Sequence, residues 1–83
     1  MKKVLVSVYV LSLDKTYDIL LPINLPMKDV IDLIKSAIVE MSNGVFVNSN
    51  DSKLYEGNTG KLVNINNIVK FSGIRNGCKL MLV

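Results

Sequence analysis

The chain has 83 residues, 49% of them apolar, and its ten lysine and arginine residues against seven aspartate and glutamate residues give a formal net charge of +3. This length predicts a single domain over residues 1–83, near the size at which one core can sustain a fold alone. With no histidine and one cysteine, Cys78, an internal disulfide and the usual zinc and iron–sulfur ligand sets are excluded, and we expect no metal or cofactor.

The N-terminal part predicts a β-hairpin. Valine occupies every even position between Lys3 and Val10, and a period of two is typical of a strand with one uniform face. After a polar reversal, Thr16–Pro22 repeats this alternation and predicts the second strand. The side chains expected to point inward are Val4, Val6, Val8, Val10, Tyr17, Ile19 and Leu21.

An amphipathic helix of about four turns is predicted to begin at Pro26, because proline suits the first helical position. Apolar residues then recur at the spacing of one helical face, and polar residues lie mostly opposite. The expected apolar stripe contains Val30, Ile34, Ala37, Ile38 and Met41, and the polar side contains Lys28, Asp32, Lys35, Ser36 and Glu40. Asn43 and Gly44 provide the stop, since glycine tolerates the left-handed conformation that often follows a helix.

The second half predicts three further strands. An ordered loop over residues 45–51, anchored by Phe46, leads to two short strands, Lys53–Glu56 and Lys61–Val63, around a glycine-bounded reversal. A helical turn within residues 64–71 precedes the last strand, Cys78–Val83. The order ββαβββ predicts an α+β fold in which one sheet packs on one main helix.

Short motifs accompany this order. They are Thr16-Tyr17-Asp18 at the start of the second strand, Leu25-Pro26-Met27-Lys28 before the helix, and the turn Gly73-Ile74-Arg75-Asn76-Gly77 before the last strand. Together they resemble the ubiquitin-like β-grasp over nearly the whole chain, and within it the small YukD/EsaB proteins of bacterial type VII secretion systems. The resemblance implies a mixed sheet of four or five strands in which the first and last strands are adjacent and parallel.

The resemblance also implies a function. YukD/EsaB proteins are cytoplasmic accessory factors of a membrane-embedded secretion machine and are not known as enzymes. We therefore expect a cytoplasmic, non-enzymatic adaptor whose partner is a type VII secretion component, with no small-molecule substrate and with membrane contact only through that partner. The last strand is expected to end at Val83 without a mobile Gly-Gly tail, which disfavours the conjugation and sulfur-transfer chemistry of ubiquitin relatives.

A protein-binding site is expected on the outer face of the sheet. If the last strand buries Leu80 and Leu82, alternation turns Met81 and Val83 outward. On the first strand the even-numbered valines are expected inside, so Leu5, Ser7 and Tyr9 point outward. The expected site is an apolar strip of Leu5, Tyr9, Tyr55, Met81 and Val83, which Leu20 could extend. Exposed methionine and tyrosine suit adaptable recognition of a protein. The alternatives are that loop residues such as Phe46 cover the strip, or that it forms a weak homodimer.

Two other function classes are alternatives. A regulatory nucleic-acid-binding protein could use the scattered lysines, but basic clusters interleaved with aromatic residues are missing, so we expect no nucleic-acid partner. An enzyme would need an acid, a base and a nucleophile, and no such set can be assembled. Cys78 has no histidine to act as its base and is interpreted as an ordinary strand residue rather than a reactive thiol.

Overall fold

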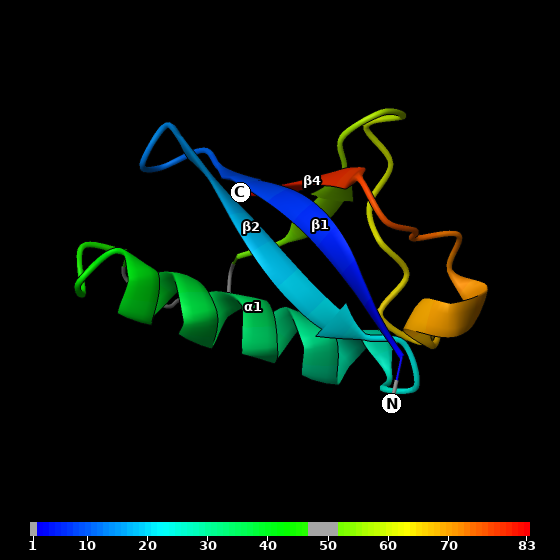
Figure 1. Ribbon diagram of the computed structural model, residues 1–83. Helices are drawn as coiled ribbons and strands as arrows, with labels where there is room; N and C mark the ends of the chain where they lie inside the picture. Colours follow the sequence, from blue (N-terminus) through cyan, green and yellow to red (C-terminus); the bar gives the residue numbers. More distant parts are fainter. Residues whose placement is uncertain (1, 47–51) are drawn as a thin grey trace.

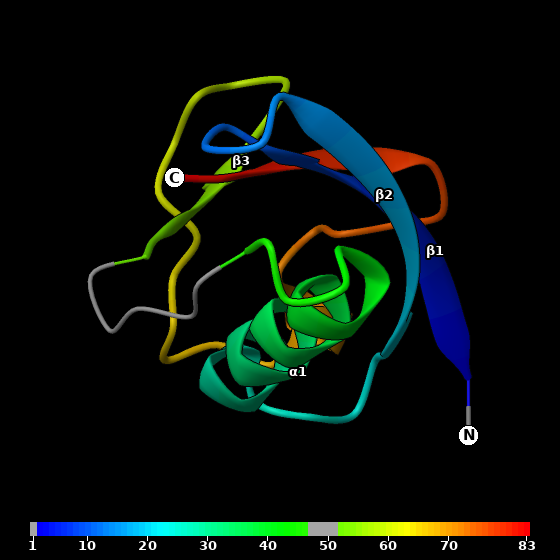
Figure 2. The same ribbon diagram turned by 90° about the vertical axis from the view of Figure 1, so that its left-hand side faces the viewer.

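A four-stranded sheet covers one α-helix. In the computed structural model, which describes residues 2–46 and 52–83, the sheet has the strand order β2-β1-β4-β3. Figures 1 and 2 show the sheet curving over α1, which lies against one of its faces. The elements are β1 (Lys3–Val10), β2 (Lys15–Pro22), α1 (Met27–Met41), β3 (Leu54–Glu56), a 3₁₀-helix η1 (Val69–Phe71) and β4 (Cys78–Leu82).

The strand pairing is mixed. β1 and β2 form an antiparallel hairpin, β1 and β4 run parallel at the centre of the sheet, and β3 pairs antiparallel with β4 at the edge. In the parallel pair Val6 lies opposite Cys78 and Val10 lies opposite Leu82. The predicted fold class, with adjacent and parallel first and last strands, is therefore confirmed.

The core lies between the helix and the inner face of the sheet. The even-numbered positions of β1 from Val6 to Val10 are fully buried, as alternation predicts. The facing side chains, none of them more than 6% exposed, are Ile19, Leu21, Val30, Ile34, Ile38, Leu54, Leu80 and Leu82. Each such side chain contributes about 1.5–3 kcal/mol relative to an exposed one, so helix–sheet packing dominates the stability.

The predicted strand Lys61–Val63 is reduced to a single bridge between Leu62 and Tyr55. Two backbone hydrogen bonds flank it: the Glu56 amide donates to the Lys61 carbonyl, and the Val63 amide donates to the Leu54 carbonyl. Pairing then ends because Asn64 begins a turn, in which its side-chain oxygen accepts a hydrogen bond of 3.0 Å from the Asn66 amide. The sheet consequently has four strands.

Two helix positions differ from the predicted amphipathic pattern. Lys35, expected on the polar side, is only 6% exposed, whereas Met41, expected in the apolar stripe, is 49% exposed. Lys35 follows Ile31 by four residues and precedes Ile38 by three, so its aliphatic stem covers the same helix face. Met41 is the last residue of α1 and lies at the surface, where Ser42 caps the helix.

Both ends of α1 are fixed by backbone hydrogen bonds. Pro26 is the N-cap residue instead of the first helical one, and the amide of Met27 donates to the Asn67 carbonyl at 2.7 Å. At the other end Asn43 and Gly44 have positive φ angles of 55° and 81°, which confirms the predicted stop. Within residues 2–46 and 52–83, none of the helices has the length and hydropathy of a membrane span.

The loop after α1 is described only in part. Phe46 is 6% exposed and belongs to the core, and its amide donates to the Ser42 hydroxyl at 3.0 Å. Its predicted anchoring role is confirmed. The expectation of an ordered loop over residues 47–51 lies outside the described residues.

Candidate protein-binding face

Three half-buried side chains lie side by side on the outer face of the sheet. Tyr9 of β1 is opposite Met81 of β4, and Met81 is opposite Tyr55 of β3. Their neighbours along each strand, such as Val8, Leu80 and Leu54, are buried, so alternation directs the three side chains away from the helix. Two aromatic rings thus flank a methionine on adjacent strands.

Two more exposed apolar residues continue this cluster at the end of β4. Val83 is 49% exposed and forms a reciprocal pair of 2.9 Å backbone hydrogen bonds with Lys53. Leu11 is 51% exposed, and its amide donates to the Leu82 carbonyl, which completes the last pair of the β1–β4 register, Val10 and Leu82. We call Tyr9, Leu11, Tyr55, Met81 and Val83 the outer patch.

The remaining predicted site residue, Leu5, lies apart from the outer patch. It is 43% exposed and pairs across the hairpin with Leu20, which is 56% exposed. The next outward position of β1 is Ser7, whose hydroxyl hydrogen-bonds to the Asp18 carboxylate at 3.0 Å and which lies opposite exposed Lys79. A polar row therefore separates Leu5 and Leu20 from the outer patch, so the predicted strip consists of two clusters.

A hydrogen bond holds the polar tip of Tyr9. Its phenol donates to the Asp14 carboxylate, in the turn that follows β1. This bond, together with desolvation and the negative charge of Asp14, raises the pKa of Tyr9 above its ordinary value of 10.0. The tyrosine ring is thereby tethered at one end while its apolar face remains beside Met81.

Sequence reasoning missed Leu11, which was assigned to the polar reversal. Strand alternation could not identify it, because Leu11 lies in the turn after β1 and the next odd-numbered residue, Leu13, packs against the core. Phe46 lies in the core on the helix side of the sheet, so it does not cover the outer patch. Cys78 is half-buried and packs against the core opposite Val6, in the environment of an ordinary strand residue.

Potential metal ligands are not clustered in the described residues. Within residues 2–46 and 52–83, no group of three or more histidine, cysteine, aspartate or glutamate side chains could hold a metal ion. The outer patch itself combines apolar area with two phenol groups and is bordered by the exposed lysines Lys53 and Lys79. Such a surface is suited to contact with another protein.

Comparison with known proteins supports the architecture. No family model and no curated protein matches the chain. The ubiquitin-like domain of the Mycobacterium tuberculosis type VII secretion system protein EccD1 is 20% identical, with a TM-score of 0.74 over 100% of this chain and 99% of that one. The EccD5 ubiquitin-like domain from Mycobacterium xenopi is 13% identical, with a TM-score of 0.80 over 100% and 94%. The chain has the ubiquitin-like β-grasp fold.

A third similarity shows that this fold does not decide activity. A chain of the toluene 4-monooxygenase HD complex with the inhibitor 4-bromobenzoate is 12% identical, with a TM-score of 0.78 over 99% of this chain and 98% of that one. Chains of similar fold thus occur in a secretion protein and in an enzyme complex alike. The function must be argued from the surface residues of this chain.

Proposed function

We propose that the chain is a cytoplasmic, non-enzymatic adaptor of a bacterial type VII secretion system, related to the YukD/EsaB proteins, that binds a protein component of that system through the outer patch. The single observation that carries the docking mechanism is the adjacency of Tyr9, Met81 and Tyr55 on three neighbouring strands. The secretion context is supported by the sequence resemblance and by the likeness to ubiquitin-like domains of EccD proteins.

The composition of the outer patch favours a protein partner. Tyrosine supplies a large contact area at low entropic cost, methionine adapts its shape to a partner, and both residue types are enriched at protein interfaces. Lys53 and Lys79 border the patch with positive charge. The partner is therefore expected to present an apolar anchor with acidic residues around it.

A secretion assay tests this proposal. Cells that lack the chain are complemented with the unaltered chain or with Met81→Glu, and export of a substrate of the type VII secretion system is measured. Met81→Glu places a charge at the centre of the outer patch, so export should fall to the level of cells without the chain. Export at the unaltered level would reject the outer patch as the binding face.

Val45→Glu is the matched control. Val45 is 68% exposed and follows α1, so the same apolar-to-acidic change falls outside the outer patch. Export should remain normal in this variant. Circular dichroism of both purified variants checks that the fold is retained.

The salt dependence of partner binding tests the nucleic-acid alternative. If the affinity of the purified chain for its partner fell steeply with added salt, nucleic-acid binding would be favoured over the adaptor role.

A further inference from the structure

Two asparagine–glycine pairs occur in the chain, Asn43-Gly44 and Asn76-Gly77. An asparagine followed by glycine is prone to lose its side-chain amide, because glycine has no side chain to keep its backbone nitrogen away from the asparagine. That nitrogen attacks the side-chain carbonyl carbon, and ammonia leaves. Water then opens the cyclic imide to aspartate or to isoaspartate, in which the main chain runs through the side-chain carbon. Any difference between the two pairs must come mainly from the fold.

In the second pair, one residue of β1 holds both reacting groups. The Leu5 amide donates to the Asn76 side-chain oxygen at 2.7 Å, and the Gly77 amide donates to the Leu5 carbonyl at 2.8 Å. The reaction would require both bonds to break, so that the Asn76 side chain can turn toward the Gly77 nitrogen. These bonds lie where β4 joins β1 at the centre of the sheet, and central strands open only at a high cost in free energy.

The first pair is held only at the end of a helix. The Gly44 amide donates to the Val39 carbonyl of α1 at 2.8 Å. Asn43 and Gly44 are both exposed, and the Asn43 side chain has no hydrogen bond to any other described residue. Helix ends fray at little cost in free energy. The Gly44 nitrogen is therefore released for reaction far more often than the Gly77 nitrogen.

We propose that Asn43 is a site of spontaneous modification in the folded chain. When the end of α1 frays, the Gly44 nitrogen bonds to the side-chain carbonyl carbon of Asn43, and the side-chain nitrogen leaves as ammonia with the proton of the Gly44 amide. Water is the only other reactant, and the products are aspartate and isoaspartate. Asn76 is spared as long as the sheet stays intact. This proposal rests on the hydrogen bonds of the two pairs and stands independently of the secretion role.

The modification would change the charge at the C-terminal end of α1. A helix carries a partial negative charge at this end, so a new carboxylate there is unfavourable. The last turn of α1 contains Glu40 and no basic residue that could offset the added charge. Isoaspartate also lengthens the main chain next to the bond between Gly44 and Val39. The modified chain should therefore be less stable than the unaltered one.

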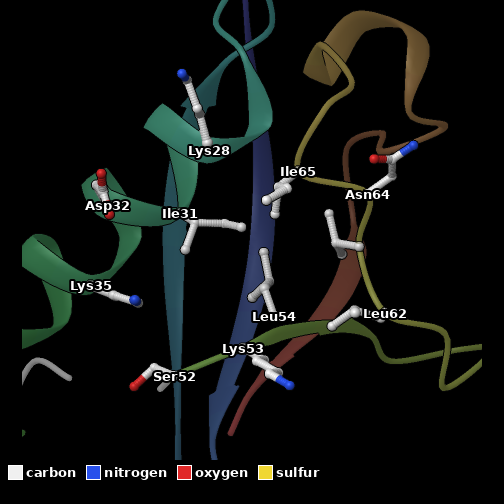
Figure 3. Close-up of a pocket in the computed structure, with 11 residues that line it drawn as sticks. Lys28, Ile31, Asp32, Lys35, Ser52, Lys53, Leu54, Leu62, Asn64 and Ile65 are labelled. Carbon is white, nitrogen blue, oxygen red and sulfur yellow. The ribbon is translucent and has the colours of Figure 1, made fainter. Parts of the chain in front are cut away.

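Asn64 provides an internal comparison with a different following residue. Figure 3 shows Asn64 beside Ile65 on one wall of the groove that α1 forms with the segment after β3. The branched side chain of Ile65 crowds its own backbone nitrogen, which hinders attack on the preceding residue. The Asn64 side-chain oxygen also accepts a hydrogen bond of 3.0 Å from the Asn66 amide. Asn64 should thus react slowly whether the chain is folded or unfolded.

Peptide mass spectrometry of the chain incubated in mildly alkaline buffer tests the site. In the folded chain, amide loss at Asn43 should be more than about tenfold faster than at Asn76, because the helix end opens more readily. In concentrated urea the two rates should become similar, and Asn64 should remain the slowest of the three. Equal rates at Asn43 and Asn76 in the folded chain, faster loss at Asn76, or no reaction at Asn43 would overturn the proposal.

A variant of the chain tests the consequence for α1. Asn43→Asp reproduces the aspartate product, so its thermal unfolding midpoint in low salt should lie below that of the unaltered chain, and added salt should reduce the difference. Asn58→Asp is the matched control, because it adds the same charge at an exposed turn residue away from α1. Its midpoint should change less. A midpoint of Asn43→Asp equal to or above that of Asn58→Asp would reject the destabilising effect.

Discussion

The side-chain oxygen of Asn76 accepts a hydrogen bond of 2.7 Å from the backbone amide of Leu5, 71 residues earlier in the chain. The next residue, Gly77, donates its amide to the Leu5 carbonyl at 2.8 Å. The regular β1–β4 register begins one residue further on, where Val6 lies opposite Cys78. The Asn76 side chain therefore adds one more hydrogen bond between β1 and the segment that leads into β4, just before the regular pairing of these two strands begins.

Asn76→Ala should destabilise the fold by about 1 kcal/mol, since it removes this acceptor and leaves the Leu5 amide without it. Urea unfolding followed by circular dichroism measures the change. Asn76→Asp retains an acceptor oxygen and should lose less stability than Asn76→Ala. Equal unfolding midpoints for Asn76→Ala and the unaltered chain would contradict this role of the side chain.

Gly57 lies where two backbone segments approach closely. Its amide donates to the Lys79 carbonyl at 2.7 Å, and a Cβ added at this glycine would lie 2.9 Å from the same oxygen. Gly57→Ala must displace β3 from β4, so we expect a loss of about 1–3 kcal/mol in the free energy of unfolding.

The matched control for Gly57 is its neighbour in the same turn. Asn58→Ala alters an exposed residue and should change stability by no more than about 0.5 kcal/mol. Chemical denaturation of both variants measures the difference. If Gly57→Ala were as stable as Asn58→Ala, the close approach would be irrelevant to folding.

The Tyr9–Asp14 hydrogen bond predicts a pH dependence. The folded-state pKa of Tyr9 is raised, so the bond stabilises the fold fully below pH 10.0, the ordinary pKa, and its contribution is lost as the pH rises through the raised folded value. Asp14→Asn removes the negative charge and should lower the pKa of Tyr9 toward 10.0.

Tyrosinate absorbance during an alkaline titration measures this shift. The chain has three tyrosines, and the curve of Asp14→Asn should differ from that of the unaltered chain by the earlier ionisation of one of them. Tyr9→Phe identifies that tyrosine, because its curve should not change on adding Asp14→Asn. Superimposable curves for Asp14→Asn and the unaltered chain would show that the hydrogen bond does not form in solution.

Residue alternation predicted most of the fold correctly. The period of two in Lys3–Val10 identified the buried face of β1, Pro26 marked the start of α1 to within one residue, and Asn43 and Gly44 marked the turn just after its end. These features are local, so a single sequence contains them. The prediction of a short strand at Lys61–Val63 was wrong. Only one bridge forms there, because the turn that begins at Asn64 ends the pairing.

The partition of the outer face could not be predicted. Which outward residues become neighbours depends on the β1–β4 register, and a parallel pair far apart in sequence does not reveal its register through alternation. The register places Ser7 opposite Lys79 and thereby separates Leu5 from Tyr9 and Met81.

The central claim is that the outer patch contacts a type VII secretion component, and site-specific crosslinking in cells tests it most directly. The photoreactive residue benzoylphenylalanine is placed at Met81, or at Val45 as the control, and adducts are identified by mass spectrometry. We predict an adduct with a secretion component from position 81 and none from position 45. Absence of any adduct at position 81, or the same adducts from both positions, would contradict the claim.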